Sequence, residues 1–241
     1  MSERSMKQSI TSNRPRETLA LALDFPDLPT AVSMARRLKQ YFGIAKVGLE
    51  LFSAAGPRAV GALAEEGYEV FVDLKLHDIP NTVGSAAKVI GSLGASYLTV
   101  HCSGGIAMIQ AAADGFETGA AGAGLAAGKL IGVTVLTSEE DASVDVLRQR
   151  MQWAEEGGCK GVVAAATDLA MIRDMAPQLI RVVPGIRLEG AERHDQKRTA
   201  TPAQAIAEGA NLLVIGRNVT EARDPVRAAA TIYAAVESAK S

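Results

Sequence analysis

The sequence predicts an α/β fold, a single (β/α)8 TIM barrel in which eight parallel strands alternate with helices. Short apolar runs recur eight times along the chain, and amphipathic or Ala-rich segments of helical length lie between them. The composition does not change between these repeats, so nothing marks a second domain. The length of 241 residues is also usual for this barrel.

The apolar runs give the predicted strands, which are Leu19–Asp24, Ile44–Leu49, Glu69–Leu74, Ser96–His101, Leu130–Leu136, Gly161–Ala165, Leu179–Pro184 and Leu212–Gly216. The predicted helices include Leu28–Tyr41, Gly56–Glu66, Val83–Leu93, Val144–Glu156, Asp168–Ala176, Pro202–Gly209 and Pro225–Ser238. Gly and Ala dominate residues 119–128, where we expect a flexible helix end or a surface loop. A doubly wound open sheet is the alternative fold. It ordinarily has a Gly-rich phosphate turn after the first strand, where this chain has Asp24-Phe25-Pro26.

The N-terminal residues and the bulk composition indicate where the protein works and which classes of partner are excluded. Residues 1–17 are polar and lack the apolar core of a signal peptide, so we expect a loosely ordered leader before a catalytic domain at 18–241. No apolar run is long enough to cross a bilayer. The formal net charge of −2 argues against a nucleic-acid or membrane partner held by bulk charge. Cys102 and Cys159 have no metal-site spacing and favour a reducing, cytoplasmic location.

Polar side chains end four consecutive predicted strands on the same face. Side chains of a strand alternate between two faces, and the larger aliphatic residues of these strands fall on the face that packs under the helices. The face toward the barrel axis ends in Asp24, Lys46, Asp73 with Lys75, and His101. Active sites of this fold lie at the carboxyl ends of the strands. A solvated salt-bridge cluster is the alternative, but alternating acids and bases from neighbouring strands are more typical of a functional site.

The motif Asp73-x-Lys75-x-x-Asp78 lies at the centre of this group. Asp73 and Lys75 share one strand face, and Asp78 follows in the loop before a predicted helix. Nearby negative charge keeps a lysine protonated. Lys75 is therefore predicted to donate a proton and not to act as a neutral amine nucleophile.

The loops after the seventh and eighth predicted strands have the features of a phosphate site. They contain Pro184-Gly185-Ile186-Arg187 and Ile215-Gly216-Arg217. Glycine lets the backbone approach an anion, a helix start offers amide donors, and arginine can bind two phosphate oxygens. Alternatively, the glycines only turn the chain and the arginines are surface charges, but two such loops in adjacent barrel positions favour phosphate. His101 is predicted to be a structural hydrogen-bonding residue, and His77 and His194 to be solvated.

Eight short motifs follow one another from about Leu19 to the last helix. They are LALDF at 21–25, AKVGLELF at 45–52, FVDLKLHDIPNTV at 71–83, VHCSGG at 100–105, VTVLTS at 133–138, VPGIR at 183–187, DQKR at 195–198 and IGRNV at 215–219. In order and spacing they resemble the orotidine 5′-phosphate decarboxylase family. The DxKxxD string alone is moderately specific, and its combination with Lys46, the turn at 185–187, Gln196 and Arg217 is strongly specific.

The resemblance implies a cofactor-free carboxy-lyase that converts orotidine 5′-monophosphate to uridine 5′-monophosphate, the last step of de novo UMP synthesis. It implies catalysis by Lys75, Asp73, Lys46 and Asp78, with Lys75 as the proton donor to the carbanion. The substrate-binding residues that it implies are Asp24, Lys46, Asp73, Thr82, Thr137, Ser138, Arg187, Gln196, Gly216 and Arg217, and no metal is expected. It also implies a homodimer in which Asp78 and Thr82 reach into the neighbouring subunit's site.

Two other functions remain open at this point. One is a metal-dependent phosphosugar decarboxylase or lyase on the same barrel. Those relatives share DxKxxD but carry a glutamate metal ligand where Lys46 stands here, and a cation at that position repels magnesium. The other is a non-catalytic nucleotide-binding barrel, which would bind uridine monophosphate without turnover. An intact Lys75 argues against it.

Overall fold

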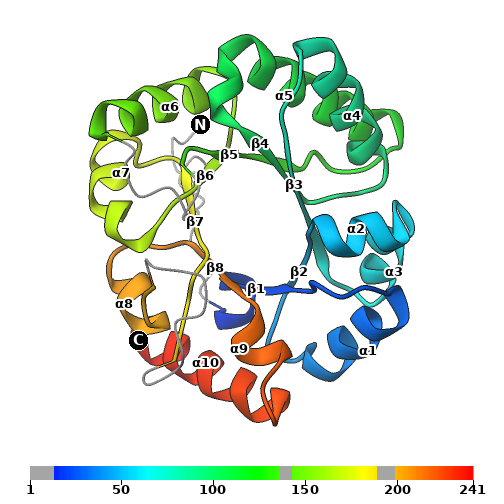
Figure 1. Ribbon diagram of the computed structural model, residues 1–241, viewed down its shortest axis with the longest axis vertical. Coiled ribbons are helices and arrows are strands. Elements are labelled where there is room, and N and C mark those ends of the chain that lie inside the picture. The colour runs from blue at the N-terminus through cyan, green and yellow to red at the C-terminus, as the bar shows by residue number, and fades with distance from the viewer. Residues whose placement is uncertain (1–13, 136–142, 189–198, 241) are drawn as a thin grey trace, which may run out of the picture.

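Eight parallel strands close into one barrel in sequence order, as predicted. The computed structural model describes residues 14–135, 143–188 and 199–240. Within them β1 pairs with β2 on one edge and with β8 on the other, which closes the ring seen in Figure 1. The strands are β1 (Leu19–Ala22), β2 (Ile44–Val47), β3 (Glu69–Leu76), β4 (Tyr97–His101), β5 (Lys129–Val133), β6 (Gly161–Val163), β7 (Ile180–Val183) and β8 (Leu212–Ile215).

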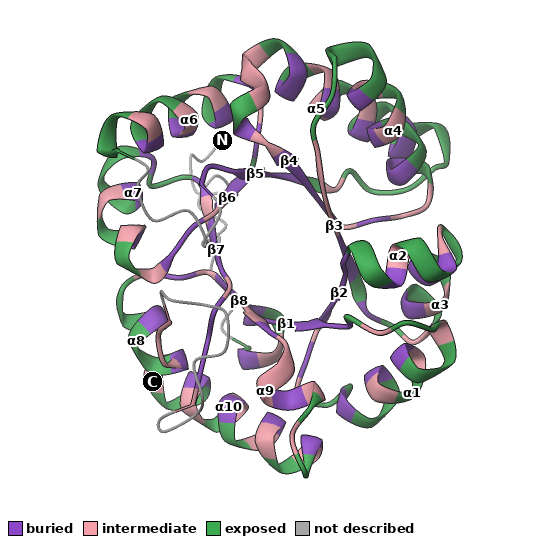
Figure 2. Ribbon diagram, in the orientation of Figure 1, coloured by how far each residue is buried: buried purple, intermediate pink, exposed green. Residues whose placement is uncertain are grey.

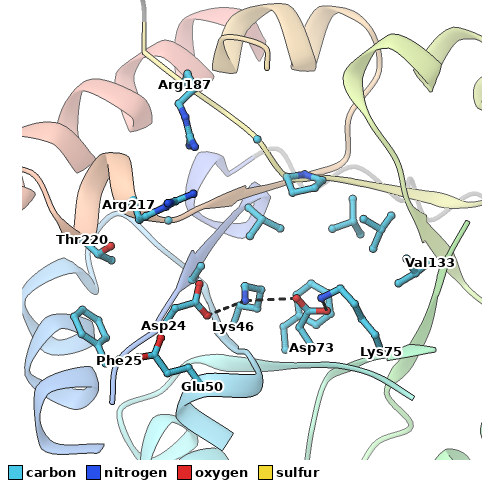
Figure 3. Close-up of a pocket in the computed structure, with 18 of the residues that line it drawn as sticks. Asp24, Phe25, Lys46, Glu50, Asp73, Lys75, Val133, Arg187, Arg217 and Thr220 are labelled. Atoms are coloured by element: carbon cyan, nitrogen blue, oxygen red, sulfur yellow. Dashed lines mark hydrogen bonds and ion pairs between the residues drawn. The ribbon is translucent and has the colours of Figure 1, made fainter. Parts of the chain in front are cut away.

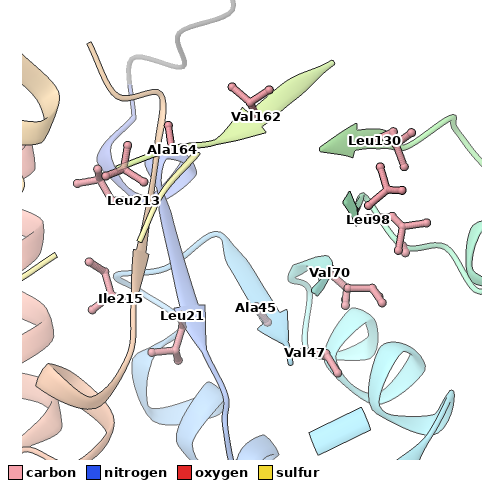
Figure 4. Packing of buried hydrophobic residues seen from close by; sticks show 14 of the residues in the cluster. Leu21, Ala45, Val47, Val70, Leu98, Leu130, Val162, Ala164, Leu213 and Ile215 are labelled. Carbon is pink, nitrogen blue, oxygen red and sulfur yellow. The ribbon is translucent and has the colours of Figure 1, made fainter. Parts of the chain in front are cut away.

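The strand side chains divide into two apolar clusters, which confirms the predicted alternation. The larger cluster lies between barrel and helices and includes Leu21, Val47 and Leu98 (Figure 4). The smaller cluster fills the barrel interior and consists of Ala20, Ile44, Phe71, Tyr97, Ile131, Val182 and Leu212. Figure 2 shows the strands buried and the outer faces of the helices exposed. The polar strand ends lie beyond the interior cluster, toward the carboxyl ends of the strands.

Helices follow the strands around the outside of the barrel, and several begin at a side-chain cap. The Asp27 carboxylate accepts a hydrogen bond from the Thr30 N–H at 2.8 Å at the start of α1 (Leu28–Leu38). Ser143 caps α6 (Val144–Glu156), and Thr201 forms a capping box with Gln204 in α8 (Pro202–Ala207). The remaining α-helices are α2 (Leu49–Ala55), α3 (Arg58–Glu65), α4 (Pro80–Ser92), α5 (Gly105–Gly122), α7 (Leu169–Met175), α9 (Arg217–Thr220) and α10 (Pro225–Lys240).

The second strand is shorter than predicted. Its pairing with β3 ends at Val47, opposite Val72. Gly48 then caps α2, a helix absent from the predicted elements. Leu49 was expected to face the helices from the strand, and this expectation is wrong, since Leu49 begins α2 and is 61% exposed.

Glycines bring α4 and α5 into close contact. A Cβ atom placed on Gly119 would lie 1.9 Å from the Lys88 carbonyl oxygen, and one on Gly115 would lie 2.1 Å from that of Gly84. The stretch 119–128 therefore begins as the packed last turn of α5, where Gly119 is buried, and continues as the connection to β5. Both a helix end and a loop occur there, as predicted, but the helix end packs against α4.

The described chain begins beside the barrel. A short 3₁₀ turn, η2 (Pro15–Thr18), precedes β1, and the Gly43 N–H donates to the Arg16 carbonyl at 2.7 Å. This turn overlaps the end of the predicted leader, whose residues 1–13 lie outside the described residues. Cys102 and Cys159 are buried, and burial raises the pKa of the Cys102 thiol to about 12. None of the described helices has the length and hydropathy needed to cross a bilayer.

Candidate active site

A cavity of about 540 Å³ opens at the carboxyl ends of the strands, where the fold predicts the site. The part of its wall formed by β1–β3 carries Asp24, Lys46, Asp73 and Lys75. The part formed by β5–β8 carries valines at 133, 163, 182 and 214. Arg187 and Arg217 lie on one side of the cavity, away from Lys75 (Figure 3). The cavity therefore combines a charged half, an apolar half and a cationic end.

The four charged side chains form a continuous series of ion pairs. Lys46 Nζ lies 3.3 Å from Asp24 Oδ1 and 3.5 Å from Asp73 Oδ2. Lys75 Nζ donates to the other Asp73 oxygen, Oδ1, at 2.9 Å. The structure thus brings together four of the predicted residues in the order acid, base, acid, base (Figure 3).

Asp73 is the shared acid of this series, and its side chain is only 14% exposed. Burial alone would raise the pKa of the Asp73 carboxyl. The ammonium groups of Lys46 and Lys75, with hydrogen bonds from Lys75 and Thr99, outweigh burial and hold this pKa below its usual range. Asp73 is therefore an anion at neutral pH, and it forms an ion pair with each of the two lysines.

Lys75 has a strained backbone. Its φ is +51°, and it is the one non-glycine residue with positive φ in the described part of the chain. The left-handed conformation costs such a residue about 1–2 kcal/mol. The pairing of β3 with β4 shifts register between Val72 and Leu76, so this conformation belongs to a bulge. Strain of this kind persists only where the surroundings fix it, and it concentrates at functional sites.

Gly48 leaves room for the first ion pair of the series. A Cβ atom there would lie 2.6 Å from Asp24 Oδ1 and 3.0 Å from Lys46 Nζ. Its φ of −88° and ψ of −175° are open to any residue, so the requirement for glycine is one of space. The carboxylate and the ammonium occupy the volume that a side chain would need.

The two arginine-bearing loops are held by different contacts. Gly185 has a φ of +77°, and the Arg187 N–H donates to the Ala200 carbonyl at 2.9 Å. Arg187 is 7% exposed. Gly216 caps the short helix α9, which begins with Arg217. Both loops reach the same cavity, which is lined by Gly185, Arg187, Gly216 and Arg217.

Other predicted site residues lie elsewhere or outside the described residues. Asp78 and Thr82 are exposed, and Asp78 Oδ1 accepts a hydrogen bond from the Ile79 N–H at 2.6 Å instead of joining the ion pairs. Thr137, Ser138 and Gln196 fall in 136–142 and 189–198, outside the described residues. Their roles stay predictions.

Two of the three histidines lie side by side, and the third lies outside the described residues. His77 is exposed, as predicted, and its ring centroid lies 5.4 Å from that of His101 at the end of β4. His194 lies outside the described residues. Among the residues that the structure describes, no three His, Cys, Asp or Glu side chains are grouped as a metal site.

A match to a protein-family model shows which family the chain belongs to. The model of the orotidine 5′-phosphate decarboxylase / HUMPS family matches residues 17–232. The chain belongs to this family. An orotidine 5′-phosphate decarboxylase of Moorella thermoacetica is 44% identical over 97% of this chain and 97% of its own length. That of Paramagnetospirillum magneticum is 42% identical over 89% of this chain and 96% of its own.

Solved structures agree with the family assignment. An orotidine 5′-phosphate decarboxylase from Lactobacillus acidophilus superposes with a TM-score of 0.75 at 34% identity, covering 90% of this chain and 98% of that one. An uncharacterized conserved protein from Geobacillus kaustophilus gives a TM-score of 0.76 at 33% identity, with 90% and 99% covered. The family's barrel is therefore the fold of this chain along nearly its whole described length.

Sequence reasoning missed part of the cavity wall of this decarboxylase-family barrel. Phe25, Glu50, Thr220 and Glu221 also line the cavity. Glu50 lies in α2, and the last two lie at the end of α9, so both helices would have had to be predicted first. The valines could have been found by extending the strand alternation, which places them on the inward face.

Proposed function

We propose that this chain decarboxylates orotidine 5′-monophosphate to uridine 5′-monophosphate without a cofactor, as the last step of de novo UMP synthesis. The observation that carries the proposal is the series Asp24–Lys46–Asp73–Lys75 in one cavity with two arginines at another side. Membership of the family and relatives named for this activity support it.

Lys75 is the proposed proton donor. Breaking the bond to carbon dioxide leaves an electron pair on a ring carbon of the pyrimidine, with no adjacent electron sink. A fixed ammonium stabilises this charge as it develops and then delivers a proton to the same carbon. Asp73 holds the Lys75 ammonium at 2.9 Å, and Lys46 holds Asp73 from the other side. Lys75 is 31% exposed, while Lys46 is 9% exposed, so Lys75 is the better placed of the two to meet a ligand.

Asp73 has a second proposed role, toward the substrate carboxylate. Two carboxylates placed close together repel each other, and the repulsion relaxes as neutral carbon dioxide leaves. The lowered pKa of Asp73 supports this role, because the residue stays ionised at neutral pH.

The rest of the substrate is assigned to the other parts of the cavity. Asp24, the most exposed of the four charged residues at 52%, accepts hydrogen bonds from ribose hydroxyls. Arg187, Gly216 and Arg217 bind the phosphate, and Gln196 reaches between phosphate and base. Thr137 and Ser138 contact the pyrimidine. Binding energy from the phosphate, remote from the reacting bond, then serves to hold the base against Lys75.

The functional unit is proposed to be a homodimer in the cytoplasm. Asp78 and Thr82 are exposed and lie outside the ion-pair series of their own chain. Ile79 between them is 65% exposed, an apolar side chain that a partner subunit would cover. The two buried thiols fit a reducing compartment.

The decisive experiment is an absorbance assay on orotidine 5′-monophosphate after exhaustive chelation. Turnover at the same rate with and without the chelator is the expected result. Activity that is lost on chelation and restored by magnesium would instead favour a phosphosugar decarboxylase or lyase. Tight binding of uridine 5′-monophosphate with no turnover would favour a non-catalytic nucleotide-binding barrel.

A further inference from the structure

Thr99 of β4 lies behind the ion-pair series and outside the cavity wall. Its residue exposure is 0%, and it is not among the residues that line the cavity. It stands where the pairing of β3 with β4 is interrupted, because Val72 pairs with Leu98 and Leu76 with Val100. Three residues of β3, including Asp73 and Lys75, therefore face the single residue Thr99.

The Thr99 hydroxyl bonds to both of these residues. The backbone N–H of Lys75 donates to Thr99 Oγ1 at 2.8 Å, and Oγ1 lies 3.0 Å from Asp73 Oδ1. A hydroxyl has one proton to give and two acceptor positions. Since the amide can only donate and the carboxylate can only accept, the hydroxyl proton must point at Asp73. One side-chain oxygen thus fixes the left-handed backbone of Lys75 and the carboxylate that holds the Lys75 ammonium.

We propose that Thr99 is a positioning residue for the decarboxylation, one that acts through Lys75 and Asp73 without touching the substrate. The inference rests on the proposed function. Within the bulge the Lys75 N–H donates its hydrogen bond to the Thr99 side chain. The hydroxyl oxygen is therefore the acceptor that a backbone carbonyl of β4 would provide in a regular sheet. Without it, the left-handed conformation loses a contact that fixes it, and the ammonium moves relative to the reacting carbon. A displacement of about 1 Å can lower a rate about 100-fold.

A matched control exists one strand away. Thr134, just after β5, is 2% exposed, and its hydroxyl donates to the Val163 carbonyl at 3.2 Å. It is buried to nearly the same degree as Thr99 and also bonds across to the neighbouring strand. It bonds to neither Lys75 nor Asp73. Thr134→Val therefore measures what the loss of a buried threonine hydroxyl does to this barrel in general.

The test compares Thr99→Val, Thr99→Ala, Thr99→Ser and Thr134→Val with the unmodified protein. For each we would measure kcat and KM on orotidine 5′-monophosphate, Kd for uridine 5′-monophosphate, and Tm. Thr99→Val and Thr99→Ala should lose about 100-fold in kcat with KM and Kd nearly unchanged, because the residue positions the reacting group and does not bind. Thr99→Ser keeps the hydroxyl and should stay within about tenfold of the unmodified kcat. Thr134→Val should keep kcat.

The outcomes separate this inference from the proposed function. If the unmodified protein does not turn over orotidine 5′-monophosphate, the proposed function fails and the role of Thr99 with it. If it does, and Thr99→Val matches Thr134→Val in kcat, only the inference fails. A serine variant as slow as the valine variant, or a loss shared equally by kcat and Kd, would also overturn it. If both Val and Ala variants unfold while Ser folds, the hydroxyl serves the fold and not the reaction.

Discussion

The two halves of the cavity differ in the secondary-structure elements from which their charged side chains come. In the half formed by β1–β3, Lys46, Asp73 and Lys75 lie on strands and Asp24 lies just past one, and they pair with one another at 2.9 to 3.5 Å. In the half formed by β5–β8, the strands carry valines, Arg187 lies in the loop after β7, and Arg217 is the first residue of α9. Groups that must meet a reacting atom need strands that hold them rigidly, whereas a flexible phosphate can be bound by side chains that follow the strands, in a loop or at a helix start.

The charged half also shows how buried charges become tolerable. Lys46 is 9% exposed and Asp73 14%, and an isolated charge at such a position would be costly. Each has an opposite charge on both sides along the series, so removing one member leaves another partly unpaired. The valines of the other half carry no charge, so substitutions among them lack this electrostatic dependence.

The largest expected effect is that of Lys75→Ala. Nucleotide binding should remain measurable, while kcat should fall by at least about 10⁴-fold, or about 5.4 kcal/mol of transition-state stabilisation. The reason is that, of the two lysines in the charged half, Lys75 has the ammonium group that is better placed to give a proton to the product carbanion. Steady-state assays with calorimetric binding of uridine 5′-monophosphate measure both quantities.

A suitable control for Lys75→Ala is Lys129→Ala. Lys129 starts β5 at the opposite end of the barrel, with its ammonium 4.8 Å from the centre of the Tyr97 ring. It should leave kcat unchanged. A Lys75→Ala protein with a tenth of the original rate would exclude Lys75 from the central role.

The second prediction concerns subunit mixing, which tests whether a second subunit contributes a residue to the charged half. Asp78→Ala and Lys75→Ala homodimers should each be nearly inactive, although Asp78 lies outside the ion pairs of its own chain. In a mixed dimer both lesions fall in one site and the other site is intact. Random exchange at equal mixing makes half of the dimers mixed, so activity should recover to about a quarter of the original.

The mixing experiment needs its own control, which is mass measurement of the exchanged dimers. Recovery of activity only when exchange is allowed would support a shared site. Confirmed exchange without any recovery would place Asp78 in the site of its own chain, and the shared-site proposal would then be abandoned.

Arg217→Ala tests the cationic end of the cavity and should weaken substrate binding. It should lower kcat/KM for orotidine 5′-monophosphate about 100-fold, since hydrogen bonds to charged groups contribute about 1.5–3 kcal/mol each. For the unphosphorylated nucleoside the loss should be much smaller. Arg223→Ala, an exposed arginine beyond α9, is the control. Equal losses for the two substrates would show that Arg217 does not contact phosphate.

Much of the charged half could be predicted from the sequence because strand alternation is a strict geometric rule. It places Asp24, Lys46, Asp73 and Lys75 on the inward face, and the ion pairs confirm that they meet. The rule does not anticipate the bulge at Lys75 or the hydrogen bonds of Thr99 to Lys75 and Asp73, because a register shift depends on which strand lies alongside.

Glycine shows a second limit of sequence reasoning. The stretch 119–128 was expected to be a flexible helix end or loop because glycine adds backbone freedom. The same absence of a Cβ atom allows Gly119 to lie against Lys88 of α4, where it is buried. Composition alone does not distinguish these two uses, since the difference lies in a neighbouring helix.

The smallest expected effect, that of Gly48→Ala, sharpens the comparison within the charged half itself. The added methyl group would meet the ends of the Asp24 and Lys46 side chains at 2.6 and 3.0 Å, while the backbone conformation accepts alanine without strain. Side-chain ends can move aside, so the fold and Tm should be preserved, and the exposed Asp24 should move more than the buried Lys46. If Asp24 binds the ribose, the result is a KM raised about tenfold with a smaller change in kcat, because a charged hydrogen bond is weakened and not lost.

Gly61→Ala in α3, where a Cβ atom meets nothing within 4 Å, should leave both constants unchanged. An unaltered KM in the Gly48→Ala protein would show that the position of Asp24 does not limit substrate binding.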